Sequence, residues 1–227
     1  MISRTSGYIA ALLCTCLTHA LASEISGRIV TEKAGSAKIF APAIYDLRGI
    51  AVSSSSSNGR ASNGYERIAI WLESKASVPA APVKVVMRQR NRRIEPDILI
   101  VPVGSTVEFP NSDPIFHNIF SLSRTQSFDL GYYAEGRSRS VTFSRPGIVQ
   151  VYCHVHPNMY GVIVVTASRW SGRPTQDGTY SLSEVPPGTY RMCVWQKAVG
   201  VMHRNITVPE AGSLRMNVAI PDQAWEN

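Results

Sequence analysis

The chain has 227 residues, 44% of them apolar, which is enough to bury the core of one large or two small domains. Its formal charge of +7 comes without a nucleic-acid-binding motif, so we expect no nucleic acid as a partner. No stretch after the N-terminus reaches the ~18 apolar residues of a membrane-spanning helix, so we expect no transmembrane segment in the mature chain.

Residues 1–22 have the pattern of a secretory signal peptide. A positive start at Met1–Arg4 precedes an apolar run over Tyr8–Leu17, and Ala20-Leu21-Ala22 is a small-x-small cleavage signal. The alternative is an N-terminal anchor that stays uncleaved. Cleavage after Ala22 predicts a periplasmic or secreted protein.

The rest of the chain has the composition of an all-β protein. Glycine, proline and serine interrupt short runs rich in Val, Ile, Tyr and Phe, and no long stretch keeps a helical apolar period. We expect an N-terminal β segment over 23–80, which contains a low-complexity loop at 51–64 and a linker at 75–82.

A first sandwich is expected over 83–167, where turn signals separate seven short apolar runs. The expected strands are 83–89, 97–103, 105–110, 116–121, 140–144, 147–153 and 161–166. A second β unit is expected over 168–227. There "DGTYSLSEVPPGTYRMCVW", residues 177–195, alternates strand and turn, with the turn at 186–188.

A compact basic cluster, "MRQRNRR", occupies residues 87–93. Arg88, Arg90 and Arg92 would share one face of a strand, with Arg93 next to them. A solvated face is the simpler interpretation. Steering toward an acidic partner is the functional one.

Soft and nitrogen donors are concentrated in "VYCHVHPNMYGVIVV", residues 151–165. Cys153, His156 and Met159 are each three residues apart, so one loop can curl around an ion. His117, in "DPIFHNIF", is the candidate fourth donor. Two imidazoles, a thiolate and a thioether favour copper, because structural zinc usually takes more cysteines and calcium and magnesium prefer oxygen.

The segments "RNRRIEPDILIVPVG", "GSTVEFPNSDPIFHNIFSLS" and "VTFSRPGIVQVYCHVHPNMYGVIVV" together resemble a complete cupredoxin, a Greek-key β-sandwich. The spacing Cys-x-x-His-x-x-Met is similar to the short ligand loop of amicyanin. The resemblance implies one type 1 copper ion with His117, Cys153 and His156 as tight ligands and Met159 as the long axial ligand. It also implies that Asn118 braces the ligand loop from the second shell.

The second β unit resembles carboxypeptidase-regulatory, transthyretin-like domains, a smaller β-sandwich. "SEISGRIVTEKAG" and "ERIAIWLES" near the N-terminus are similar to strands of the same domain type. This resemblance implies that the cupredoxin is inserted within the second sandwich. The combination resembles exported proteins labelled methylamine-utilisation proteins, although that label does not identify a substrate.

Several alternatives stay open at the level of single residues. Cys153 and Cys193 are the two cysteines left after signal removal, and an exported protein could join them in a disulfide. His154 is expected to point away from an ion bound by Cys153, because neighbouring side chains of an extended segment face opposite ways. The alternative role for His154 is as a ligand of a second metal.

The leading functional hypothesis is a one-electron carrier that cycles between Cu(I) and Cu(II) and exchanges electrons with an acidic redox partner protein. An enzyme is not expected, because the histidines left over cannot build a trinuclear copper cluster. The alternatives are a periplasmic copper storage or delivery protein and a structural module that keeps the fold without the chemistry.

Overall fold

The structure is a computed structural model that describes residues 23–32, 65–75 and 78–221. The expected signal peptide (1–22) and the low-complexity loop (51–64) lie outside the described residues. Within the described ranges every regular element is a β-strand, apart from the short 3-10 turn η1 (Tyr65–Arg67). None of the helical structure in these ranges is long and apolar enough to cross a membrane.

The central sandwich is built from residues 84–166. Its larger sheet contains, in spatial order, β6 (Ile98–Pro102), β12 (Tyr160–Thr166), β11 (Gly147–Tyr152), β8 (His117–Leu122) and β9 (Ser127–Tyr133). Its smaller sheet contains β10 (Ser138–Thr142), β7 (Thr106–Pro110) and β3 (Lys84–Val86). A hairpin of β4 (Arg88–Arg90) and β5 (Arg93–Glu95) lies beside β7, where Gln89 pairs with Asn111.

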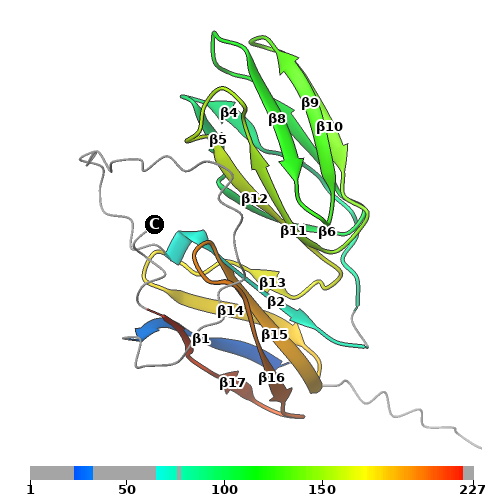
Figure 1. The fold of residues 1–227 in the computed structure, drawn as a ribbon. Helices are drawn as coiled ribbons and strands as arrows, with labels where there is room; N and C mark the ends of the chain where they lie inside the picture. The colour runs from blue at the N-terminus through cyan, green and yellow to red at the C-terminus, as the bar shows by residue number, and fades with distance from the viewer. Residues whose placement is uncertain (1–22, 33–64, 76–77, 222–227) are drawn as a thin grey trace, which may run out of the picture.

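The flanking sandwich combines strands from both sides of the central one in the sequence (Figure 1). One sheet contains β14 (Thr179–Val185), β1 (Ser23–Glu32) and β17 (Ser213–Arg215), with β18 (Val218–Pro221) also paired to β1. The other contains β13 (Ser171–Gly172), β2 (Ile68–Glu73), β15 (Gly188–Gln196) and β16 (Gly200–Val208). Strands before and after residues 84–166 therefore complete each other's sheets.

The observed strands differ from the expected ones mainly in the basic cluster. The expected strand 83–89 is divided into β3 and β4, and Arg92 does not continue it. Asn91 and Arg92 have φ angles of 54° and 55°, the left-handed conformation that a two-residue hairpin turn requires. Arg92 therefore does not share a strand face with Arg88 and Arg90.

Two strands were absent from the sequence-based expectation, and one was displaced. β5 follows the turn just described, and β9 is an edge strand with largely exposed residues and a glycine, Gly131, at a φ of 65°. β5 is only three residues long, and in β9 the alternation of Phe128 and Leu130 with polar residues is the apolar pattern that the sequence-based expectation missed. The strand expected at 140–144 lies instead at 138–142.

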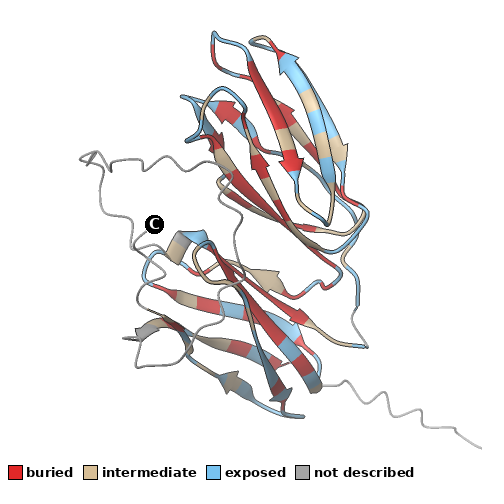
Figure 2. Cartoon of the chain, viewed as in Figure 1, coloured by how far each residue is buried: buried red, intermediate tan, exposed pale blue. Residues whose placement is uncertain are grey.

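Three strands are buried on both faces, which explains their nearly continuous apolar sequences (Figure 2). Alternate residues of β2 and β15 pack in the core of the flanking sandwich, and alternate residues of β12 pack in the core of the central one. Residues from their opposite faces meet in a shared cluster between the sandwiches, to which β6 adds Ile98: Ala69, Trp71, Val162, Val164, Cys193 and Trp195. The two sandwiches are thus joined by a buried apolar interface.

Candidate metal centre

The candidate ligand loop connects two adjacent strands of the larger sheet. β11 ends at Tyr152 and β12 begins at Tyr160, and these two residues are paired across the ladder. The chain between them must therefore turn back within seven residues, 153–159. The turn is closed by the backbone N–H of Met159, which donates to the carbonyl of His156 at 2.9 Å.

His117 reaches the same end of the sheet from the start of β8. The loop before it is ordered by Asn111, whose Nδ2 donates to the carbonyls of Ile115 at 2.8 Å and Tyr133 at 3.0 Å. Asn111 Oδ1 also accepts a hydrogen bond from the backbone N–H of Asp113 at 2.9 Å. This contact forms an Asx-turn, in which an Asn side chain binds the backbone two residues further on. This loop begins with residues 111–114, Asn-Ser-Asp-Pro, which are residue types that favour turns.

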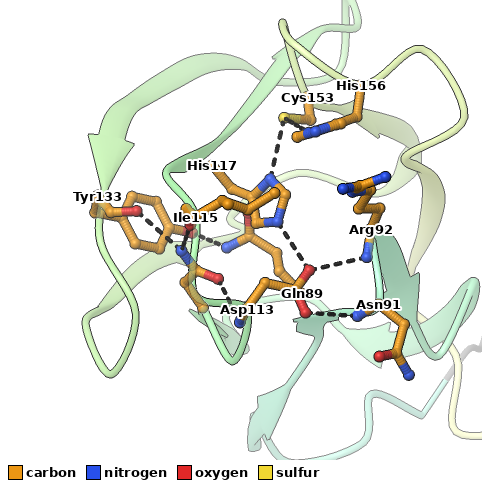
Figure 3. A network of polar contacts seen from close by, with 10 residues as sticks. Gln89, Asn91, Arg92, Asp113, Ile115, His117, Tyr133, Cys153 and His156 are labelled. Carbon is orange, nitrogen blue, oxygen red and sulfur yellow. Dashed lines mark hydrogen bonds and ion pairs between the residues drawn. The ribbon is translucent and has the colours of Figure 1, made fainter.

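The structure brings His117, Cys153 and His156 together. Their ligand atoms all lie within 4.8 Å of one another. Cys153 Sγ is 3.9 Å from His117 Nδ1 and 3.8 Å from His156 Nδ1 (Figure 3). The two imidazole rings meet edge to face, with centroids 4.7 Å apart. Both histidines therefore present Nδ1 to the sulfur, and three converging donor atoms suit a soft transition metal.

Burial differs among the candidate ligands. His117 is fully buried, Cys153 is 5% exposed, and His156 is only half-buried at the end of the molecule. Met159 is fully buried and packs in the same apolar cluster as Cys153. The site is thus closed on the His117 side and opens toward solvent at His156.

Burial, followed by the electrostatic effects of the neighbouring His117 and Arg92, lowers the pKa of His156. A lowered pKa keeps the imidazole neutral at neutral pH, and the neutral imidazole is the form that binds metal ions. The donor set therefore fits a copper ion in both residue type and protonation of His156.

Asp113 contacts a candidate ligand, and the sequence analysis did not identify it as part of the site. Its Oδ2 lies 2.9 Å from Nε2 of His117, the ring nitrogen that faces away from Cys153. A ligand histidine commonly donates its second N–H to a carboxylate, which fixes the tautomer and the ring orientation. An acidic residue four positions before a candidate ligand histidine was the signal that could have found it.

The Asp113 carboxylate also accepts the backbone N–H groups of Asn91 at 2.6 Å and Arg92 at 2.8 Å. Burial by itself would raise the pKa of Asp113, but the hydrogen bonds from Arg92, His117 and Asn91 together lower it. Asp113 is therefore an anion that ties the β4–β5 turn to His117.

Asn118 and His154 lie on the other side of the ligand loop. Asn118 Oδ1 accepts the backbone N–H of His154 at 2.8 Å, so the side chain holds the residue that follows Cys153. The His154 side chain is exposed, stacks on Phe120 with ring centroids 3.9 Å apart, and lies 3.3 Å from an Asp129 carboxylate oxygen. It does not belong to the group of converging donors around Cys153.

Cys153 and Cys193 are both free thiols in the structure. Cys153 packs in the core of the central sandwich, whereas Cys193 packs in the cluster between the sandwiches. Burial, followed by the negative charge of Glu73, raises the pKa of Cys193 to about 12. Cys193 is therefore a neutral buried thiol, and Cys153 is available as a ligand.

No protein-family model matches the chain, and the search of curated proteins gave no match. Among solved structures, the chain is similar to a copper-containing nitrite reductase from Thermus scotoductus SA-01, with 26% identity and a TM-score of 0.36. That match covers 41% of this chain and only 25% of the reductase.

The chain is also similar to an oxidised mutant of amicyanin, with 25% identity and a TM-score of 0.35, over 36% of this chain and 81% of amicyanin. A purple cupredoxin from Nitrosopumilus maritimus has 29% identity and a TM-score of 0.31, over 34% of this chain and 84% of the other. With TM-scores below 0.5, these likenesses do not decide the metal or the function, which depend on the site itself.

Proposed function

We propose that the chain is a type 1 copper protein that carries one electron at a time. One observation carries this proposal: Cys153 Sγ lies within 4 Å of the Nδ1 atoms of two histidines, and Cys153 and Met159 are buried in the same apolar cluster. His117, Cys153 and His156 would be the tight ligands and Met159 the weak one. Bound there, copper would supply one-electron chemistry between Cu(I) and Cu(II).

The protein's own contribution is a fixed and mostly dry set of ligands. The hydrogen bonds of Asp113 and Asn118 hold His117 and the ligand loop from opposite sides. A ligand set that is held rigidly changes little when the charge of the ion changes, which keeps electron exchange fast. The half-buried His156 is the proposed exit for the electron, since it is the most exposed of the donors that converge on Cys153.

The visible spectrum of the purified protein with one equivalent of Cu(II) tests this function. We expect one copper per chain and an intense blue or green colour from thiolate-to-copper charge transfer. Cys153→Ser should abolish the colour, whereas His154→Ala should leave both the colour and the stoichiometry nearly unchanged. A colourless Cu(II) complex of the wild type would refute the electron-carrier proposal.

A copper storage or delivery role is the second candidate, and one observation favours it. Met192, Met202 and Met216 line an apolar cavity of about 200 Å³ in the flanking sandwich, although they are far apart in the sequence. Thioethers are soft ligands that select Cu(I). Binding of a second Cu(I) per chain, lost in Met202→Leu, would favour this role over simple electron transfer.

We further propose that the protein is exported after cleavage behind Ala22 and that its redox partner is an acidic protein. The sequence of residues 1–22 and the basic cluster of the β4–β5 hairpin support these two proposals. N-terminal sequencing of the exported protein tests the first, with Ser23 as the expected first residue. Secreted protein that begins at Met1 would contradict it.

A further inference from the structure

A cavity of about 780 Å³ opens directly beside the candidate ligand His156. One wall is the β4–β5 hairpin and the other is the ligand loop. The lining residues that matter for its chemistry are Arg67, Arg92, Arg93, Asp97, His156 and Asn158. The half-buried, most accessible donor of the site therefore faces a space that is lined mainly by charged and polar groups.

Two of the cationic side chains in this cavity have no acidic partner in the described part of the chain. Arg67 is 3.2 Å from Asp97, which also lies 3.7 Å from Arg173, so this carboxylate is already neutralised. Glu95 also lines the cavity, but no ion pair joins it to Arg92 or Arg93 among the described residues. The guanidinium groups of Arg92 and Arg93 are thus available to an outside anion.

The backbone holds Arg92 in place before any ligand arrives. Its φ of 55° is uncommon for a residue with a side chain, and Asn91 beside it has a φ of 54°. The Asp113 carboxylate stabilises this turn by accepting both amide N–H groups, and the same carboxylate contacts His117. The position of Arg92 is therefore coupled to the ligands, and in Figure 3 its side chain extends from the turn toward His156.

Two large apolar side chains next to the candidate ligands in the sequence are exposed. Phe116 is 62% exposed and Val155 is 50% exposed, and both are neighbours of candidate ligands in the sequence. A small free anion would leave these side chains in water, whereas a protein surface would cover them. A cationic cavity beside His156, together with exposed apolar side chains next to the candidate ligands, therefore suits an acidic side chain that projects from the surface of another protein.

We propose that this cavity is the docking site of the redox partner, and that it receives a carboxylate side chain of the partner between Arg92, Arg93 and the edge of His156. Arginine is suited to this role because its planar guanidinium binds a carboxylate with two parallel hydrogen bonds. Docking here places the partner against His156. The inference rests on the proposed electron-transfer function, because it assigns the partner of the same site.

The first test uses the metal-free protein, so that it does not depend on copper. A hexaglutamate peptide is titrated into the 15N-labelled protein, and amide shifts are followed by NMR at low ionic strength. We expect saturable shifts at Arg92, Arg93 and Asn158, and at least fivefold weaker binding by Arg92→Gln. Arg124→Gln is the matched control, because it removes the same charge from an exposed loop between β8 and β9.

Three outcomes of this titration would overturn the docking site. They are shifts confined to other basic residues, equal affinity of Arg92→Gln and wild type, and equal weakening by Arg124→Gln. Sodium acetate is titrated in parallel. Binding of acetate as tight as that of the peptide would mean that the cavity takes a free carboxylate and not a protein surface.

The second test uses the copper-loaded, reduced protein and two inorganic oxidants of opposite charge. Hexacyanoferrate(III) should oxidise Arg92→Gln about three to ten times more slowly than wild type at low salt. The reason is that the variant lacks the positive charge of Arg92, which attracts this anionic oxidant to the site. The rate with tris(phenanthroline)cobalt(III), a cation, should not fall. If the reduced wild type is not oxidised at all, or if its Cu(II) form is not coloured, the electron-carrier function fails. The peptide titration would still test the docking site in that case.

Discussion

The carboxylate of Asp113 connects two parts of the site that are distant in the sequence. It lies 2.9 Å from His117 Nε2 and also accepts the amides of Asn91 and Arg92. A negative charge behind a ligand imidazole stabilises the more positive oxidation state of a metal. Asp113 should therefore lower the reduction potential of the copper site.

We expect Asp113→Asn to raise the potential. A unit charge several ångströms away contributes ~1–3 kcal/mol at an effective dielectric constant of about 20, which corresponds to roughly 50–130 mV for one electron. Cyclic voltammetry measures the shift. Asp129→Asn is the matched control, because Asp129 pairs with His154 and not with a candidate ligand, so its shift should be smaller. Equal shifts in the two variants would contradict a specific role for Asp113.

Met159 differs from the other candidate ligands because a thioether is a weak donor. Met159→Leu should keep the intense absorption band, since the thiolate stays in place, and should raise the potential because an electron donor to Cu(II) is lost. Met87→Leu controls for packing, as Met87 is equally buried in the same core. Both changes should cost less than about 1.5 kcal/mol of unfolding free energy. A Met159→Leu potential equal to that of Met87→Leu would exclude Met159 as a ligand.

At the level of elements, close packing just after the ligand loop restricts which residue β12 can have at position 161. A Cβ at Gly161 would lie 2.9 Å from Ile94 Cγ2, 2.9 Å from Met87 Cε and 3.2 Å from Val151 Cγ2. The β4–β5 hairpin and β11 thus pack against bare backbone at this position. Glycine is needed here for close approach, since its φ lies outside the left-handed range.

Gly161→Ala should therefore lower the unfolding free energy by about 1–3 kcal/mol through overpacking. Gly172→Ala is the control, because its Cβ would meet nothing closer than Leu182 Cδ2 at 3.7 Å. Urea denaturation of both variants measures the difference. If Gly161→Ala is as stable as Gly172→Ala, the β4–β5 hairpin does not pack against Gly161 as closely as the structure indicates.

At the scale of the whole molecule, the two cysteines belong to different environments. Cys193 lies in the cluster between the sandwiches, with a pKa raised to about 12, and Cys153 lies beside the histidines. The processed, metal-free chain should titrate as two free thiols when it is unfolded without reductant. In the native state Cys193 should react slowly at neutral pH, because the thiolate is the reactive form. Peptide mapping that links Cys153 to Cys193 would remove the copper site.

The interface between the sandwiches should make them unfold together. Trp195 is 3% exposed in the shared cluster, whereas Trp170 is 5% exposed in the core of the flanking sandwich alone. Either tryptophan-to-alanine change should cost about 3–5 kcal/mol. The wild type should show one calorimetric transition, and only Trp195→Ala should divide it into two. Two transitions in the wild type would show that the interface does not couple the sandwiches.

The sequence by itself determined the class of fold and the candidate donors. Short apolar runs with turn residues predict β-strands, and the all-β sandwich is confirmed. Cys153, His156 and Met159 could be selected because they are close in the chain, and "DPIFHNIF" marked His117 as a fourth. These are local patterns, which depend on residue type and spacing and so can be read without knowing how the chain folds.

The tertiary structure decided the contacts between distant segments. Asn91 and Asp113 are 22 residues apart, and only the placement of β4 beside β7 brings them within 2.6 Å. The same placement turns Arg92 away from the strand face that periodicity predicted and toward His156. Trp71 and Trp195 likewise meet Val162 and Val164 only because two sandwiches pack together. Such contacts depend on strand order and register, which many sequences with the same apolar pattern could satisfy differently.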